Sequence, residues 1–213
     1  MAYYPLFVRL EGKECLVVGG GEVAERKVAS LLDYGARVRV VSPSLSPGLK
    51  GLVEAGRVSW VSRSYESGDS KGAFLAFAAT DDNEVNQRVA QEVEEAGGLV
   101  NVVDSPRRCR FIVPAVVRRG ELVMAVSTGG HSPALAKRVR RELEERFPPE
   151  YALLVRLVSQ VRKQLKAEGR RVAPQAWQEA LDQGLRELLR QGKVEEAKEW
   201  LLQSLQGRRG NPW

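Results

Sequence analysis

Residues 14–27, ECLVVGGGEVAERK, join an apolar run to an amphipathic segment through three glycines. The apolar run predicts a buried strand, and residues 22–34 predict a helix. Between them, Gly19, Gly21 and Ala24 have the spacing G-x-G-x-x-A. In this setting the first glycine permits a tight turn, the second lets the backbone approach a pyrophosphate, and the alanine allows close helix packing. The stretch therefore predicts a dinucleotide site at a helix N-terminus, with a merely structural glycine turn as the alternative.

The same alternation of strand and helix continues to residue 113. Further β-branched runs predict strands at 37–42, 57–61, 73–79 and 99–103, and amphipathic segments predict helices near 45–55 and 82–96. Asp81 or Asp82 is suited to cap the last of these helices, and Gly97-Gly98 to end it. Strands that alternate with helices predict βαβ units, so the fold class is α/β with a Rossmann-like parallel sheet.

The pattern changes after residue 113. Two β-rich runs around Arg119-Gly120-Glu121 predict a hairpin, and Ser132-Pro133 opens a helix that Phe147 ends. The segment 114–150 is too small for a core of its own and must pack on the first domain or on a second subunit.

The remaining residues read as helical. One apolar stripe runs from Tyr151 to Leu165, a second from Trp177 to Leu189, and a third short helix carries Val194 to Leu201, before a tail at 207–213 that we expect to fray. The predicted organisation is a dinucleotide-binding domain at 1–113, a small α+β segment at 114–150 and a helical domain at 151–213.

Composition excludes several classes of protein. The chain has 213 residues with 43% hydrophobic and 28% charged side chains, and no apolar run approaches the length of a membrane span. The N-terminus lacks the pattern of a secretory signal, which predicts a cytoplasmic protein. Cys15 and Cys109 form no C-x-x-C pair and there is a single histidine, so we expect neither a disulfide framework nor a metal site.

The charge of the chain indicates only that a binding partner would be negatively charged. The net charge is +6, and in residues 151–213 Lys and Arg outnumber Asp and Glu by five. Such an excess attracts a polyanion, whether nucleic acid or a metabolite with many carboxylates. The basic region shows no nucleic-acid motif, so we expect no nucleic-acid partner.

The second strand lacks the acidic residue that commonly binds the adenosine ribose. It ends Val40-Val41-Ser42-Pro43, with no carboxylate. Three interpretations stay open here: the ribose is held by Ser42, Ser44 and backbone groups, a phosphorylated ribose is held by Arg37, Arg39 or Arg63, or no dinucleotide binds. These residues leave NAD and NADP equally open.

Asn101-Val102-Val103-Asp104 ends the fifth predicted strand. The carboxyl ends of parallel strands face the ligand crevice, so Asp104 lies where a bound nicotinamide would meet its substrate and could act as a general base. The alternative is that Asp104 caps the following Ser105-Pro106 turn.

Ser127-Thr128-Gly129-Gly130-His131-Ser132-Pro133 is a loop of small hydrogen-bonding residues that enters a helix. Its amide groups could bind a carboxylate or phosphate, or it could be an ordinary connection. The only histidine, His131, lies here, either as an acid/base group or simply as an exposed side chain.

Four motifs, in order, resemble one family. They are PLFVRLEGKECLVVGGGEVAERKVASLL, FAATDDNEVNQRVA, NVVDSPRRCRFIVPAVV and VSTGGHSPALAKRVR, which together span about residues 3–150. The chain resembles the precorrin-2 dehydrogenase family, which includes the N-terminal half of bacterial siroheme synthase and a fungal bifunctional dehydrogenase/ferrochelatase. The resemblance implies NAD-dependent oxidation of precorrin-2 to sirohydrochlorin in siroheme biosynthesis and, in some members, insertion of ferrous iron.

The resemblance also assigns roles by position. Glu22 and Val23 would contact NAD after the glycine turn, Pro43 and Ser44 would line its adenosine end, and Asp104 matches the catalytic aspartate. Candidate substrate contacts are Asn101, Ser127, Thr128, Gly129 and His131. Thr128 replaces a serine found in some members, and the position of His131 varies.

The family fold implies a homodimer in which segment 114–150 is interlocked between subunits. The competing interpretation is an NAD-sensing regulatory module with a basic helical tail, which leaves Asp104 and the 127–133 loop without a role.

Overall fold

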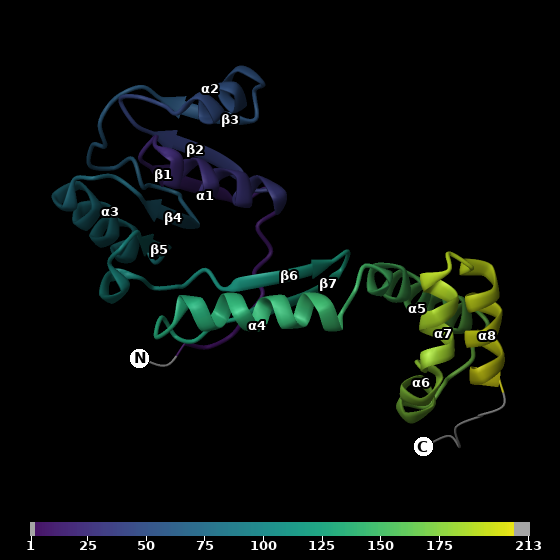
Figure 1. The fold of residues 1–213 in the computed structure, drawn as a ribbon. Helices are drawn as coiled ribbons and strands as arrows, with labels where there is room; N and C mark the ends of the chain where they lie inside the picture. The colour runs from purple at the N-terminus through teal and green to yellow at the C-terminus, as the bar shows by residue number, and fades with distance from the viewer. Residues whose placement is uncertain (1–2, 207–213) are drawn as a thin grey trace. The chain divides into compact units, whose positions relative to one another are not determined.

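The computed structural model describes residues 3–206 (Figure 1). The chain divides into two compact units, Met1–Val113 and Pro114–Trp213. The expectation of a frayed tail at 207–213 lies outside the described residues. Among the helices of residues 3–206, none has the length and apolar character needed to cross a membrane.

The first unit is a five-stranded parallel sheet, as predicted. Its strands are β1 (Glu14–Val18), β2 (Arg37–Val41), β3 (Val58–Val61), β4 (Leu75–Ala78) and β5 (Leu99–Val102), and their order in the sheet is β3-β2-β1-β4-β5. The strand order reverses between β1 and β4, so a topological switch point lies beside the carboxyl end of β1. Ligands of open α/β sheets bind in the crevice at such a point.

Helices cover both faces of this sheet (Figure 1). On one face, α1 (Glu22–Asp33) and α2 (Pro47–Glu54) pack on Cys15, Val17 and Val40. On the other face, α3 (Asn83–Glu95) packs on alternate residues of the same strands. Because both faces are buried, the central strands are continuous apolar runs rather than alternating ones.

Local signals fix where these helices begin. The Asp82 carboxylate accepts hydrogen bonds from the amides of Glu84 and Val85 at 2.8 and 3.1 Å, so Asp82 rather than Asp81 caps α3. Ser46 accepts from the Leu49 amide, and Pro47 takes the first position of α2. The helix predicted from residue 45 therefore begins at Pro47, since Ser46 is its cap.

The second unit begins with the predicted hairpin. Strands β6 (Ala115–Arg119) and β7 (Leu122–Val126) pair antiparallel around Gly120, and α4 (Pro133–Arg146) packs against them. Few residues of this segment are buried. Val117 is the only buried residue in the two strands of the hairpin, and Ala136 is the only buried residue in α4.

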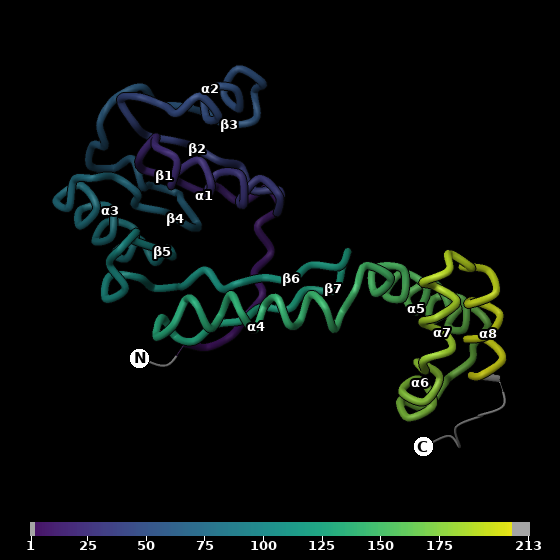
Figure 2. Tube along the Cα trace, viewed as in Figure 1, coloured from purple at the N-terminus to yellow at the C-terminus, as the bar shows by residue number. Residues whose placement is uncertain are grey.

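The rest of the unit is helical. Its helices are α5 (Glu150–Ala167), α6 (Pro174–Ala180), α7 (Gln183–Arg190) and α8 (Val194–Gln206), and Figure 2 shows them gathered into one bundle. The prediction of one continuous stripe from Trp177 to Leu189 was wrong, because the chain breaks at Leu181–Asp182. The Asp182 carboxylate caps α7 by accepting from the Leu185 amide at 2.8 Å, and the third helix, α8, is longer than expected.

The helical bundle has its own core. Its buried apolar residues all lie between Leu154 and Leu205. We therefore propose a domain boundary at residue 150, between a hairpin segment with few buried residues and a helical bundle with a packed core.

Candidate functional site

The glycine turn between β1 and α1 lies at the switch point. Gly19 has φ +121°, a conformation that favours glycine, and a Cβ there would lie 2.3 Å from the Ala79 carbonyl oxygen. Gly21 is the N-cap of α1, and no side chain caps that helix. A Cβ at Gly21 would meet nothing within 4 Å. The first turn of α1 thus presents uncapped amide groups beside open space, which fits a pyrophosphate.

Gly20 is the glycine that our reading of the sequence did not single out. A Cβ there would lie 1.9 Å from the Ser44 carbonyl oxygen and 2.7 Å from Ser42 Oγ. The Gly20 carbonyl accepts a 2.7 Å hydrogen bond from the Ser46 amide. The loop after β2 therefore packs directly on the glycine turn, and only glycine fits between them. The run of three glycines in the sequence was the available signal.

The predicted cofactor residues gather around this turn. Glu22 and Pro43 are exposed, Val23 is half-buried, and Ser44 is exposed beside Gly20. Ser42 is buried, and its hydroxyl donates to the Ser44 carbonyl at 2.8 Å. The Ser42 hydroxyl is thus used inside the loop, which leaves Ser44 and backbone groups to face a ribose.

The end of β4 is held by a residue that the sequence analysis also missed. The buried Asn86 side chain accepts from the Thr80 amide at 3.2 Å and from the Thr80 hydroxyl at 2.9 Å, and donates to the Thr80 carbonyl at 2.8 Å. These bonds fix the strand end against which Gly19 packs. Asn86 lies on the apolar face of α3, and a polar residue there was the signal.

The three arginines considered for a phosphorylated ribose differ in their positions and in their bonding partners. Arg37 begins β2, at the edge of the sheet opposite the glycine turn, and pairs with Glu14 at 2.9 Å. Arg39 donates to the Asp69 carbonyl at 2.8 Å, and Arg63 pairs with the Asp69 carboxylate. Arg37 is therefore excluded as a ribose ligand by its place in the strand, and the other two are already bonded.

Asp104 follows β5 in an unusual backbone conformation. Its φ is +57°, and among residues 3–206 no other non-glycine residue has a positive φ. The Val103 amide donates to the Ala78 carbonyl at 2.9 Å, and the Ser105 amide donates to the Val102 carbonyl at 3.2 Å, so Asp104 lies at the tip of a tight turn. Aspartate tolerates this region better than most residues, at a cost of about 1 kcal/mol or more.

The Asp104 carboxylate is exposed. The helical turn that follows, Pro106–Arg108, has Ser105 at its N-cap and no side-chain cap hydrogen bond. The capping alternative therefore has no bond to support it. Strained residues with exposed reactive groups are concentrated at functional sites, so this carboxylate at the ligand edge of the sheet is the strongest catalytic candidate.

Asn101 has a structural partner. Its side-chain amide donates to the Phe111 carbonyl at 3.0 Å, which ties the returning chain to β5. Phe111 in turn stacks edge-on against Phe77, with ring centroids 5.4 Å apart. The side-chain oxygen and the second side-chain N–H of Asn101 are left for a substrate.

The remaining predicted site residues lie in the second unit, in the loop between β7 and α4. The Gly129 amide donates to Ser127 Oγ at 3.0 Å, and the Ser132 amide donates to Thr128 Oγ1 at 2.9 Å. The His131 amide donates to the Thr128 carbonyl at 3.1 Å, and the His131 residue is exposed. Three of the six amides in this loop, those of Gly129, His131 and Ser132, are thus consumed within it, which favours the simple connection.

Burial disfavours the thiolate form of both cysteines. Burial raises the pKa of the Cys15 thiol to about 11. Burial likewise raises the pKa of Cys109, whose Sγ contacts the Val102 amide at 3.3 Å. Because the thiolate is the reactive form, both side chains act as packing residues.

The comparisons with known proteins agree with this geometry. An NAD(P)-binding family model matches residues 6–115, which include the glycine turn and Asp104. The chain belongs to this family. A second model, "Sirohaem biosynthesis protein central", matches residues 119–146.

The relatives that align with nearly the whole of this chain are siroheme synthases. The siroheme synthase of Stutzerimonas stutzeri (strain A1501) is 43% identical over 209 residues, and that of Pseudomonas aeruginosa (strain LESB58) is 42% identical over 212 residues. Each alignment covers 97% of this chain and 45% of the relative, so the chain spans less than half the length of these relatives.

A solved structure covers nearly the whole fold. SirC, a precorrin-2 dehydrogenase, is 27% identical, matches with a TM-score of 0.77, and covers 95% of this chain and 98% of its own. The resemblance inferred from the four motifs and the α/β fold class are therefore confirmed.

Proposed function

We propose that this chain oxidises precorrin-2 to sirohydrochlorin with NAD as the hydride acceptor, a step of siroheme biosynthesis. The observation that carries the proposal is Asp104, an exposed carboxylate in a strained turn at the ligand edge of the sheet, one strand away from the switch point. The similarity to SirC over 95% of the chain supports the same substrate.

The chain's own residues would orient the dinucleotide and remove a proton from the substrate. The amides of the first turn of α1 would bind the pyrophosphate, and Ser44 with nearby backbone groups would face the adenosine ribose. NAD supplies a hydride acceptor when bound. The substrate loses a hydride and a proton, and the Asp104 carboxylate takes the proton. The basic excess of residues 151–213 attracts a substrate with many carboxylates.

The test is an anaerobic incubation of the full chain with precorrin-2 and NAD. We expect NADH and the sirohydrochlorin spectrum to form together in equal amounts. If protein that binds NAD in a separate titration forms neither, the dehydrogenase proposal is wrong, and the NAD-sensing module becomes the better account.

A homodimer is part of the proposal. The hairpin and α4 bury little within their own unit, and Leu135 is half-exposed, which supports a second subunit as the surface they pack on. Sedimentation equilibrium should give twice the 23.6 kDa chain mass. A monomer at micromolar concentration that retains full turnover would contradict this part.

We also propose that the chain is cytoplasmic and that it inserts ferrous iron into sirohydrochlorin. No group of three or more potential metal-ligating side chains is found in the part of the chain that the structure describes. Asp104 would assist chelation by removing pyrrole protons, with iron as substrate. Adding ferrous iron to the anaerobic reaction should then change the spectrum faster than in an iron-only control. Equal rates would remove the chelatase activity from the proposal and leave the dehydrogenase standing.

A further inference from the structure

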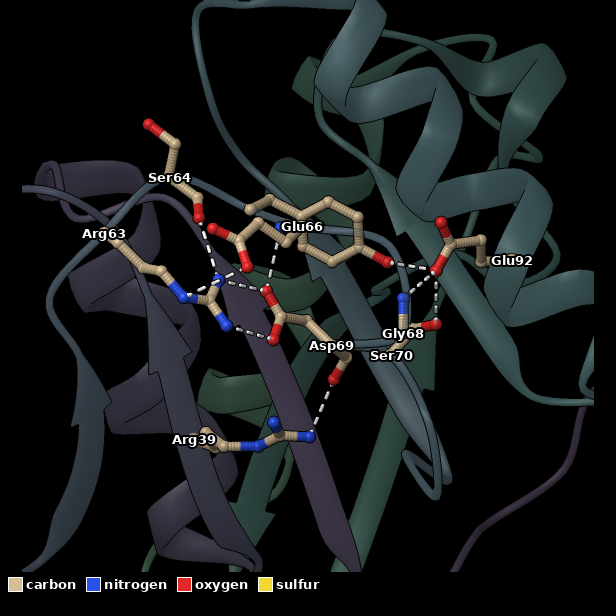
Figure 3. Close-up of polar contacts among 9 residues, drawn as sticks. Arg39, Arg63, Ser64, Glu66, Gly68, Asp69, Ser70 and Glu92 are labelled. Atoms are coloured by element: carbon tan, nitrogen blue, oxygen red, sulfur yellow. Dashed lines mark hydrogen bonds and ion pairs between the residues drawn. The ribbon is translucent and has the colours of Figure 1, made fainter.

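A cluster of charged residues joins the loop between β3 and β4 to Arg39 of β2 (Figure 3). The Asp69 side chain is nearly buried, and its two oxygens accept from the two terminal nitrogens of Arg63 at 2.7 and 2.9 Å. One of them also accepts from the Glu66 amide at 2.9 Å. Arg39 donates to the Asp69 carbonyl at 2.8 Å, so two arginines converge on one residue.

Arg63 lies at the ligand edge of the sheet. Strands β2 and β3 pair in parallel with Val41 opposite Val61, so Pro43 and Arg63 follow their strands by the same number of residues. The Ser42 amide donates to the Val61 carbonyl at 3.2 Å, which holds the two strand ends together. In dinucleotide-binding folds the end of the second strand is where an acidic residue binds the ribose hydroxyls, or where a nearby arginine accommodates a 2′-phosphate.

We propose that Asp69 sets the preference for NAD over NADP by holding Arg63 in an internal ion pair. A 2′-phosphate could recruit Arg63 only by displacing a carboxylate that already forms two parallel hydrogen bonds with it. That exchange would leave Asp69 buried without its cation, which is strongly unfavourable. The inference rests on the proposed binding of the dinucleotide at the glycine turn, but not on the substrate that is oxidised.

The Asp69 loop is also fixed on its other side, so it cannot follow Arg63 outward. The Glu92 carboxylate of α3 accepts from the Tyr65 hydroxyl and the Gly68 amide, both at 2.9 Å, and from Ser70 Oγ at 3.3 Å (Figure 3). Tyr65 is buried among the apolar residues on the α3 face of the sheet. The hydrogen bonds from Arg63 also lower the pKa of Asp69, so the carboxylate stays charged at neutral pH.

The test compares affinities for the adenosine half of each cofactor by calorimetry, with adenosine 2′,5′-bisphosphate and 5′-AMP as probes and NADP and NAD as the full ligands. In Asp69→Asn, the ratio of affinities should shift toward the 2′-phosphorylated ligand by about tenfold or more, the effect of one charge-assisted hydrogen bond. The double variant Asp69→Asn/Arg63→Gln should return to the wild-type ratio. If the ratio stays unchanged in Asp69→Asn, the proposal is wrong.

Glu66→Gln is the matched control. Glu66 is exposed, and its carboxylate lies 3.6 Å from the same guanidinium, so this variant removes the same charge but leaves the Asp69 pair intact. We expect a shift below about threefold, as for an exposed pair. A shift equal to that of Asp69→Asn would mean that general charge, not release of Arg63, sets the preference, and would overturn the proposal.

The double variant Asp69→Asn/Arg63→Gln, which leaves no buried charge unpaired, gives an independent result if Asp69→Asn does not fold. Because Arg63 is already paired, its loss should leave the ratio of affinities unchanged within about twofold. Selective weakening of the 2′-phosphorylated ligand would show that Arg63 already serves the phosphate, and would contradict the inference. Wild-type protein that binds NAD but does not oxidise precorrin-2 would overturn the proposed reaction alone, whereas loss of all dinucleotide binding would overturn both.

Discussion

Two glycine-rich loops of this chain precede helices, and they use their amide groups in opposite ways. Before α1, no side chain caps the helix, and Gly21 faces open space. Before α4, Ser132 accepts from the Leu135 amide, and Thr128 and Ser127 accept from other loop amides. A loop of small residues at a helix N-terminus is thus a candidate anion site only when its own side chains leave the amides unused.

Among changes to the two loops, the largest expected effect comes from Gly20→Ala. The new methyl group would collide with the Ser44 carbonyl, so the loop after β2 must move, at a cost of about 3 kcal/mol in the free energy of unfolding. The affinity for NAD should fall by about tenfold or more, because the displaced turn loses charge-assisted hydrogen bonds. Chemical denaturation and calorimetry would measure the two effects.

The matched change in the other loop is Gly130→Ala. Gly130 has φ +87°, and a Cβ there meets nothing within 4 Å, so only backbone strain of about 1 kcal/mol is expected. The affinity for NAD should stay at the wild-type value. Equal losses of affinity in the two variants would remove the distinction between the loops.

Gly21→Ala separates binding from stability. Gly21 has φ −84°, which alanine adopts freely, so the loss of stability should stay below about 1 kcal/mol, the cost of alanine at an N-cap. The methyl group would occupy the space into which the pyrophosphate must fit, and a tenfold lower affinity, about 1.4 kcal/mol, is expected. Gly51→Ala in α2, another glycine with open space around its Cβ, is the control that should leave affinity unchanged. Wild-type affinity in Gly21→Ala would place the cofactor elsewhere.

Thr128→Val tests whether the loop before α4 is held by its own hydrogen bonds. It removes the hydroxyl that accepts from the Ser132 amide and donates to the Ser132 carbonyl. We expect a loss of about 1 kcal/mol in the free energy of unfolding, with NAD affinity unchanged. Unchanged stability, measured by chemical denaturation, would show that these bonds do not hold the loop closed.

Local patterns in the sequence predicted much of this fold. The spacing of Gly19, Gly21 and Ala24 placed the turn correctly, and short β-branched runs predicted all five parallel strands and the hairpin. These features depend on residues close together in the chain. The break at Asp182 was missed because the apolar period runs through it, although the aspartate itself was a capping signal.

The parts that sequence could not predict are contacts that no periodic pattern encodes. Gly20 is constrained by Ser44, in the loop after the next strand. Asn86 bonds Thr80, and Asp69 bonds Arg63, each across only six residues, and these contacts follow from the shapes of the connecting segments. The same limit applied to the loop at 127–131. Its composition suits an anion site, but only the hydrogen bonds reveal that three of its amides are occupied.

The most direct test of the central claim is Asp104→Asn in a single-turnover reaction with precorrin-2 and saturating NAD. Asparagine tolerates the left-handed conformation of this position, so the turn should persist while the base is removed. We predict that NADH formation slows by about 1,000-fold, within the range for loss of a general base, while NAD affinity stays within about twofold. Turnover at the wild-type rate would show that Asp104 is not the base.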